Sequence, residues 1–210
     1  MAQPYQLSIA LAAAQATAVS ASQSPGAGAI LINGLRATSG VATLDSPRRV
    51  LFTSGGDDSG ITFTVTGTDR SGTPLGEPIA GANGTAYTTQ DFKTVTGVTH
   101  TGSVASTLTI GTNGIASSQW CSINYQIPQI EIGFVVTVSG TINYSVEYTY
   151  DNPSSPFSGT FPTVFQSSIT SQSTNKDGTI NDPVYAVRVT QNSFTSPGSL
   201  KAIIIQSGLA

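Results

Sequence analysis

The chain has 210 residues with a formal net charge of −3, and 9% of its residues are charged while 38% are hydrophobic. This hydrophobic share is enough to bury a core, but the charged share is far below the roughly 25% of an average soluble domain. Eight lysines and arginines provide no basic surface for nucleic acid, so we set nucleic-acid binding aside.

The N-terminal segment 7–14 is apolar and is similar to the core of a signal peptide. The basic region that such a peptide needs is missing, because the first positive side chain is Arg36. A strand through Leu7, Ile9 and Leu11 is therefore expected, and the low-complexity residues that follow, up to Gly28, fit either a short helix or an extended arm. No apolar run in the chain is long enough to span a bilayer, so no membrane contact is expected.

Short alternating stretches separated by turn signals follow between residues 29 and 112. Ile61, Phe63 and Val65 alternate with threonines, which predicts a strand with one apolar face and one threonine face. Further strands are expected at 29–33, 48–53, 75–79, 85–89, 92–99 and 103–111. Turn signals that recur every eight to twelve residues or so are typical of a β-sandwich or barrel.

The central stretch of the chain is 132–150, beyond a change of composition at 111–114 after which aromatic residues are more frequent. Its second half alternates polar and apolar residues, and the apolar face consists of Ile142, Tyr144, Val146, Tyr148 and Tyr150. This alternation predicts a half-buried strand whose three tyrosines belong to the core. Ser139 and Gly140 predict a turn, so that the two halves pair as a long antiparallel β-hairpin.

The C-terminal part is expected to contain a long loop and a last hairpin. Three prolines lie between residues 151 and 163, and 167–182 is polar without an apolar period, which predicts an exposed loop or arm. Tyr185, Val187 and Val189 alternate, and a turn at 196–198 leads to the apolar strand 200–205, so these two strands are expected to pair.

These patterns predict an all-β chain, because no three-turn helical pattern occurs after residue 22. We expect an antiparallel, jelly-roll-like β-sandwich made of two small β units in series. The expected boundaries are an N-terminal strand or arm at 1–28, a first unit at 29–112, and a second unit at 113–210 that includes the long loop 151–182.

Few residues are candidates for catalysis, and we predict that the chain is not an enzyme. His100 is the only histidine, and a lone histidine between threonines on a strand is expected at a surface or an edge. Glu131 and Glu147 could face each other across the hairpin as a pair of carboxylates for glycoside hydrolysis. The single cysteine, Cys121, cannot form an intrachain disulfide and is expected to be a small buried apolar residue.

Two patterns suggest ligand binding. Residues 173–181 resemble the middle of a calcium loop, but Ser173 and Val184 stand where acidic ligands are needed, so a simple turn is expected and no metal or other cofactor is predicted. Exposed tyrosines on a strand can stack on sugar rings, which would make the chain a carbohydrate-binding module. The core position expected for the tyrosines of 142–150 argues against this use.

Several strand-and-turn motifs resemble small virion structural proteins of tailed bacteriophages. The resemblance covers most of the chain from about residue 50, and the motifs are GITFTVTGTDRSG (60–72), EPIAGANGT (77–85), FKTVT (92–96), VTVSGTINYSV (136–146), YTYDNP (148–153), VYAVR (184–188) and IIIQSG (203–208). It implies a non-enzymatic, β-rich virion protein: a capsid decoration or cement protein that binds the major capsid protein, or a component of the neck or tail. A tail-associated carbohydrate- or receptor-binding module is the alternative.

The resemblance also implies how such a protein would make contacts. Arms at 1–28 and 154–182 would wrap neighbouring subunits, and a symmetric homo-oligomer is expected, with a trimer favoured by the local threefold positions of capsids. The expected interface consists of the large apolar side chains of these arms, namely Leu7, Ile9, Leu11, Phe157, Phe161 and Phe165.

Overall fold

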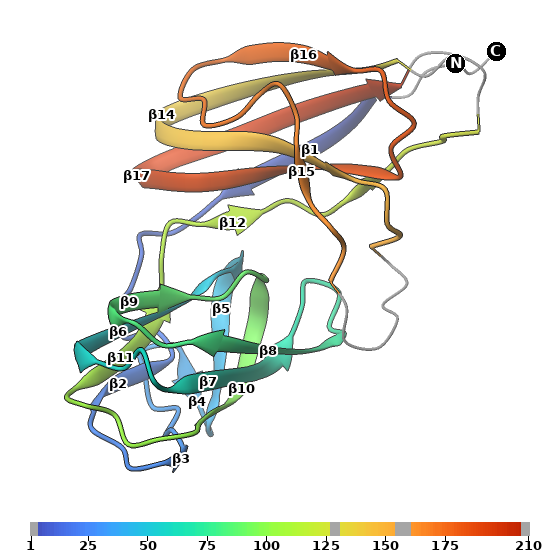
Figure 1. Cartoon of the computed structure of the whole chain (residues 1–210). Helices are drawn as coiled ribbons and strands as arrows, with labels where there is room; N and C mark the ends of the chain where they lie inside the picture. Colours follow the sequence, from blue (N-terminus) through green and yellow to red (C-terminus); the bar gives the residue numbers. More distant parts are fainter. Residues whose placement is uncertain (1–3, 127–130, 154–160, 207–210) are drawn as a thin grey trace. The chain divides into compact units, whose positions relative to one another are not determined.

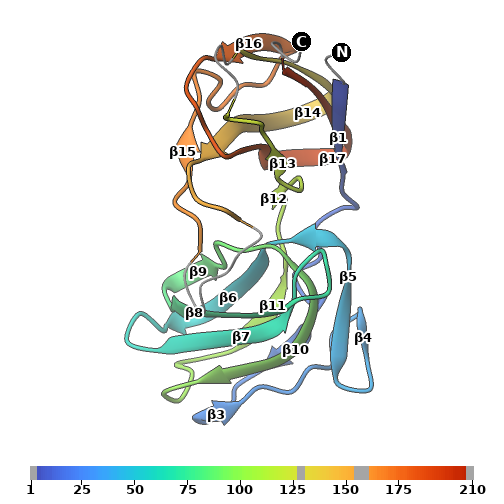
Figure 2. The same ribbon diagram turned by 90° about the vertical axis from the view of Figure 1, so that its right-hand side faces the viewer.

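A computed structural model of the chain describes residues 4–126, 131–153 and 161–206. These residues form antiparallel strands and no helix, which confirms the predicted all-β fold. None of them therefore belongs to a helix that could cross a membrane. The chain divides into two compact units (Figure 1 and Figure 2): unit 1 comprises Met1–Leu11 and Ile115–Ala210, and unit 2 comprises Ala12–Gly114.

Unit 2 is thus an insertion between the first strand of unit 1 and the rest of that unit. The strand β1 (Pro4–Ala10) pairs along its whole length with β17 (Ala186–Gln206), from Pro4 opposite Ile205 to Ala10 opposite Ser199. The expected strand near the N-terminus exists, but residues 1–28 do not form a single arm, because this pairing ties β1 to the C-terminal strand. The expected order of an arm at 1–28 and units at 29–112 and 113–210 is corrected accordingly.

Unit 1 is one seven-stranded sheet built around two long strands, β14 (Ile132–Thr149) and β17. The shorter strands pair with these two, and they are β1, β12 (Ala116–Ser117), β13 (Cys121–Ser122), β15 (Phe165–Gln166) and β16 (Lys176–Ile180). Residues 132–139 of β14 pair with 199–206 of β17, and residues 141–149 pair with 186–195. Figure 1 shows both strands turning back between these two sections, so that the sheet folds over on itself.

The bend lies at the residues that predicted a turn, but it does not create the predicted hairpins. Gly140 has a φ of 82°, in the left-handed region that favours glycine, and residues 196–198 of β17 bulge opposite it. The two halves of β14 pair with β17 rather than with each other, and the two halves of β17 likewise pair with β14. Both predicted hairpins are therefore wrong, because a left-handed glycine suits a bend within a strand as well as a turn between two strands.

The stretch expected to be the long loop 151–182 contributes to the sheet of unit 1. β15 pairs with the end of β14, and β16 pairs with residues 132–136 at its beginning. Asn175, just before β16, accepts a hydrogen bond from the Val138 amide at 2.9 Å through its side-chain oxygen. The described part of this stretch is therefore bound to its own unit, so it is not a free arm.

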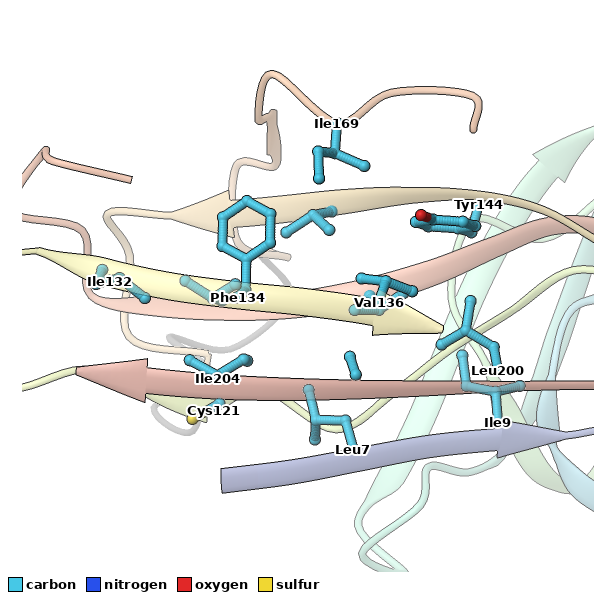
Figure 3. Packing of buried hydrophobic residues seen from close by; sticks show 14 of the residues in the cluster. Leu7, Ile9, Cys121, Ile132, Phe134, Val136, Tyr144, Ile169, Leu200 and Ile204 are labelled. Atoms are coloured by element: carbon cyan, nitrogen blue, oxygen red, sulfur yellow. The ribbon is translucent and has the colours of Figure 1, made fainter. Parts of the chain in front are cut away.

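The core of unit 1 is filled from both halves of the folded sheet. Ile132, Phe134 and Val136 from the first half of β14 and Tyr144 from the second belong to one buried cluster. Figure 3 shows Leu7 and Ile9 pointing from β1 toward this cluster beside Ile204 and Leu200. Burial of each such side chain contributes about 1.5–3 kcal/mol, so the first and last strands of the chain both stabilise this unit.

Unit 2 contains two separate sheets, as in a β-sandwich. The larger sheet has the order β4 (Ala37–Thr38), β5 (Val41–Arg48), β10 (Phe92–His100), β7 (Thr62–Thr68) and β8 (Pro74–Ala80), with β3 (Gly28–Ala29) also paired to β10. The smaller sheet has the order β2 (Ser20–Gln23), β11 (Leu108–Thr112), β6 (Val50–Asp57) and β9 (Asn83–Tyr87). Phe52 of the smaller sheet contacts Phe63 of the larger one, with ring centroids 4.9 Å apart, so one core joins the two sheets.

A buried arginine holds the two ends of unit 2. The Arg48 side chain is fully buried and donates hydrogen bonds to the carbonyl oxygens of Ala12 and Asn113, the latter near the other end of the unit. It also forms a salt bridge with Asp45 at 3.1 Å. Because a buried charge is costly unless it is paired and hydrogen-bonded, these contacts explain how the fold accommodates Arg48.

Candidate functional site

The structure divides the expected interface residues into a buried group and an exposed group. Leu7, Ile9 and Leu11 are only 3%, 4% and 6% exposed, so they belong to the core of unit 1 and are not available to a partner. This corrects the expectation, since the residues that make β1 apolar are the ones that it buries. Phe157 lies outside the described residues, whereas Phe161 and Phe165 are both 40% exposed.

Phe165 belongs to a group of three rings, here called the aromatic cluster, which also contains the exposed Tyr150 and the partly buried Tyr148. Tyr148 lies directly opposite Phe165 in the β14–β15 ladder, and their rings stack with centroids 5.6 Å apart and planes at 17°. Tyr150 meets both rings edge-on, at 5.8 Å from Tyr148 and 5.5 Å from Phe165. The three rings thus hold one another at the end of β14.

The expectation that all three tyrosines of β14 and its end lie in the core is correct only in part. Tyr144 is fully buried, and its hydroxyl donates a hydrogen bond to the Thr174 carbonyl at 2.8 Å. Tyr148 packs at the margin of the core, and Tyr150 is 49% exposed. The alternating pattern continues in the sequence to Tyr150, but β14 ends at Thr149 and the core ends with it. The three prolines in 151–163 are the sequence signal that the strand ends here.

A groove with a volume of about 360 Å³ lies beside the aromatic cluster. Tyr148 and Ile180 contribute apolar surface, and the other lining side chains carry hydroxyl, amide or carboxylate groups: Gln166, Ser167, Ser168, Thr179, Asn181 and Asp182. No local sequence pattern indicates this grouping, because residues 166–168 and 179–182 meet only through the pairing of β15 and β16 with opposite ends of β14.

The carboxylate of the groove acts electrostatically on the aromatic cluster. Desolvation first, and then the negative charge of Asp182, raise the pKa of Tyr150 above its usual value. Among the described residues, the side chains of Asn181 and Asp182 have no hydrogen-bond or ion-pair partner, so their polar atoms are available to a ligand. Gln166 is already engaged, because its amide nitrogen donates to Glu147 at 3.0 Å.

Glu147 is held in a buried network that accounts for its charge. Its carboxylate accepts hydrogen bonds from Arg188 and from the Thr190 hydroxyl, both at 2.7 Å. Burial alone would raise the pKa of Glu147, but Arg188 and these hydrogen bonds outweigh it and lower the pKa. Glu147 lies opposite Arg188 in the ladder, so it does not face Glu131 across a hairpin, and the arrangement considered for glycoside hydrolysis does not form.

The remaining candidates for chemistry also have structural roles. His100 is buried, contrary to the expected surface position, with its Nδ1 2.6 Å from the Gly102 carbonyl and its ring stacked on Phe63. Cys121 is buried as expected, and burial raises the pKa of its thiol to about 11. The end of the calcium-like stretch forms β16 rather than the expected turn, and in the described ranges no three His, Cys, Asp or Glu residues are grouped to hold a metal.

Comparison with protein-family models gives no match for this chain, and comparison with curated protein sequences gives none either.

Proposed function

We propose that the chain is a non-enzymatic structural protein of a tailed-bacteriophage virion, a capsid decoration or cement protein that stabilises the head by binding the major capsid lattice. The observation that carries this proposal is the exposed aromatic cluster on unit 1, together with the engagement of Glu147 and His100 in structural contacts. Exposed aromatic rings on a rigid sheet suit the binding of a surface. The strand-and-turn motifs that resemble virion proteins supply the biological setting.

The test of this proposal is the position of the protein in particles. Antibodies raised against the chain are applied to purified particles of the virus that encodes it, and the labelled sites are located by immunogold electron microscopy. We expect regular labelling of the head. Labelling of the collar or tail would instead identify a neck or tail component, and particles that carry no label would overturn the virion proposal as a whole.

The proposed assembly is a homotrimer that matches local threefold positions of a capsid. Light scattering coupled to size exclusion measures the mass of the purified protein, and we expect three times the 21.5 kDa of one chain. A monomer at every concentration tested would overturn the trimer and would require that assembly occur on the particle.

A second candidate function is a tail-associated module that binds carbohydrate or a receptor on the host. The groove beside the aromatic cluster favours it, because stacking rings and hydrogen-bonding side chains occur together there. Immunogold labelling at the tail tip would favour this candidate over the decoration protein.

A further inference from the structure

The aromatic cluster offers ring faces whose orientation is already fixed. Tyr148 and Phe165 are stacked across the ladder, and Tyr150 contacts both edge-on. Tyr150 and Phe165 nevertheless stay 49% and 40% exposed. A ligand that stacks on them therefore meets rings that are already immobilised, and it does not have to restrict their rotation on binding.

The groove next to these rings can bind hydroxyl groups. Asn181 provides an amide that both donates and accepts, Asp182 provides two carboxylate oxygens that accept, and Ser168 and Thr179 provide hydroxyls. The Glu147 hydrogen bond fixes the side chain of Gln166, so this wall of the groove is rigid. Polar groups at fixed positions beside a stacking surface are the usual elements of a small-molecule site.

The charge and the ring geometry exclude other ligand classes. The lining residues include the acidic Asp182 and neither lysine nor arginine, which disfavours phosphates, nucleic acid and acidic sugars. A cage for a quaternary ammonium group needs aromatic faces that surround one point, whereas Tyr148 and Phe165 are stacked against each other at 17°. A lipid tail would leave the polar groups of the groove unpaired, at a cost in free energy.

We propose that this groove is a saccharide-binding subsite for a neutral sugar, which stacks on the ring of Phe165 while Asn181 and Asp182 bind its hydroxyls. The flat apolar face of a pyranose ring fits the exposed aromatic surface, and its equatorial hydroxyls fit the polar lining. The inference rests on the second proposed function, in which the chain recognises a host surface.

The test is binding of defined oligosaccharides to the full chain. An array of neutral tetrasaccharides of glucose, galactose and N-acetylglucosamine, with a polyuronate as the charged comparison, identifies a ligand, and titration calorimetry then measures its affinity. We expect binding to at least one neutral glycan and weaker binding to the polyuronate. Phe165→Ala is expected to lower the affinity about tenfold, the loss that corresponds to one aromatic stacking contact.

Two further variants separate the site from general effects on the fold. Tyr87→Ala removes an aromatic side chain that is 51% exposed in unit 2 and should leave the affinity unchanged. Asp182→Asn keeps the shape of the groove and should weaken binding, because it replaces one of the two acceptor oxygens with an NH2 donor and removes the negative charge that strengthens hydrogen bonds from hydroxyls. Thermal melting of each variant checks that the fold is retained.

Three outcomes would each overturn the subsite. They are no binding to any neutral glycan, tighter binding to the polyuronate than to neutral glycans, and equal affinity of Phe165→Ala and the wild type. Immunogold labelling of particles distinguishes this failure from failure of the virion proposal. If Phe165→Ala protein is still found in particles but does not bind glycan, both the virion proposal and the saccharide subsite are supported. If particles are labelled but the wild type fails the glycan test, only the subsite is overturned.

Discussion

Unit 1 is built on strands of 18 and 21 residues, whereas the longest described strand of unit 2 has nine. The two halves of unit 1 share the same two strands, and a bend at Gly140 separates them. The two sheets of unit 2 contain different strands, and its ends are joined through Arg48. The stability of unit 1 should therefore depend on a backbone bend, and that of unit 2 on side-chain contacts.

The units also differ in where they place their aromatic residues. Phe52, Phe63 and Phe92 of unit 2 are at most 2% exposed and pack in its core. In unit 1, Tyr150 and Phe165 remain on the surface beside the groove. Tyr87 of unit 2 is also exposed, but it contacts no other aromatic ring among the described residues, whereas the exposed rings of unit 1 contact one another, and this difference supports the proposed binding surface on unit 1.

The largest expected effect comes from Arg48→Ala, which should destabilise unit 2 alone. Removal of one partner of a buried ion pair costs about 3–5 kcal/mol, and here two carbonyl oxygens also lose their donor. The chain has one tryptophan, Trp120 in unit 1, so fluorescence reports on unit 1 while circular dichroism reports on both units. We expect an early urea transition by circular dichroism and an unchanged fluorescence transition.

The control for Arg48 is Arg70→Ala, in an exposed turn of unit 2. This change should alter the free energy of unfolding by less than about 0.5 kcal/mol, as for most surface substitutions. If Arg48→Ala moved both transitions together, the two units would unfold as one, and the comparison between them would fail.

The sequence predicted faces of strands better than pairings between them. Alternation through Ile142, Tyr144 and Val146 identified an inward face of β14 correctly, because side chains on a strand alternate whatever the partner strand is. The structure also buries three residues of the polar face, which a half-buried strand would expose: Ser145, Glu147 and Thr149. The partner of these residues is β17, which is distant in the sequence, and no local pattern specifies it. For this reason Ser139 and Gly140 predict a hairpin turn, whereas the structure has a bend within one strand there.

The candidate site was only partly predictable, for a similar reason. Phe165 was expected at an interface and is exposed, but Leu7 and Ile9 were expected there too and are buried. An apolar strand has the same composition whether it contacts its own unit or a partner, so burial depends on tertiary pairing. Asn181 and Asp182 approach the aromatic cluster only through the pairing of β16 with β14, which the sequence alone did not indicate.

A smaller effect should separate Gly140→Ala from Gly72→Ala. The two glycines have φ values of 82° and 83°, so the left-handed backbone costs each alanine variant a similar 1–2 kcal/mol or so. A Cβ at Gly72 would meet no atom within 4 Å, whereas a Cβ at Gly140 would overlap the Pro197 carbonyl oxygen. Gly140→Ala should therefore lower the free energy of unfolding by about 1–3 kcal/mol more than Gly72→Ala does, since β17 must move to make room for the Cβ.

Urea unfolding measures both glycine variants, with fluorescence for Gly140→Ala in unit 1 and circular dichroism for Gly72→Ala in unit 2. Because the φ values match, Gly72→Ala serves as the control for backbone strain. Equal losses of stability in the two variants would mean that residues 196–198 yield freely, and the bend would then not be the weak point of unit 1.

The last effect is the pH dependence contributed by Glu147. Burial raises its pKa, but Arg188 and the hydrogen bonds outweigh burial, so the folded-state pKa lies below the unfolded value of about 4.3. A carboxylate with a lowered pKa stabilises the fold above its unfolded pKa, and this stabilisation is lost as the pH falls through its folded pKa. Glu147→Gln should therefore cost about 1.5–3 kcal/mol at pH 7, the value of hydrogen bonds to a charged group.

The difference between wild type and Glu147→Gln should shrink below about pH 4, as the wild-type carboxylate is protonated. Trp120 fluorescence is a suitable probe, because the Arg188 guanidinium lies 4.4 Å from the ring centroid of Trp120 and contacts Glu147 as well. Asp177→Asn, an exposed carboxylate on β16, is the matched control and should have little effect at either pH. A difference that stayed constant from pH 7 to pH 3 would mean that packing, not the charge of Glu147, stabilises this part of unit 1.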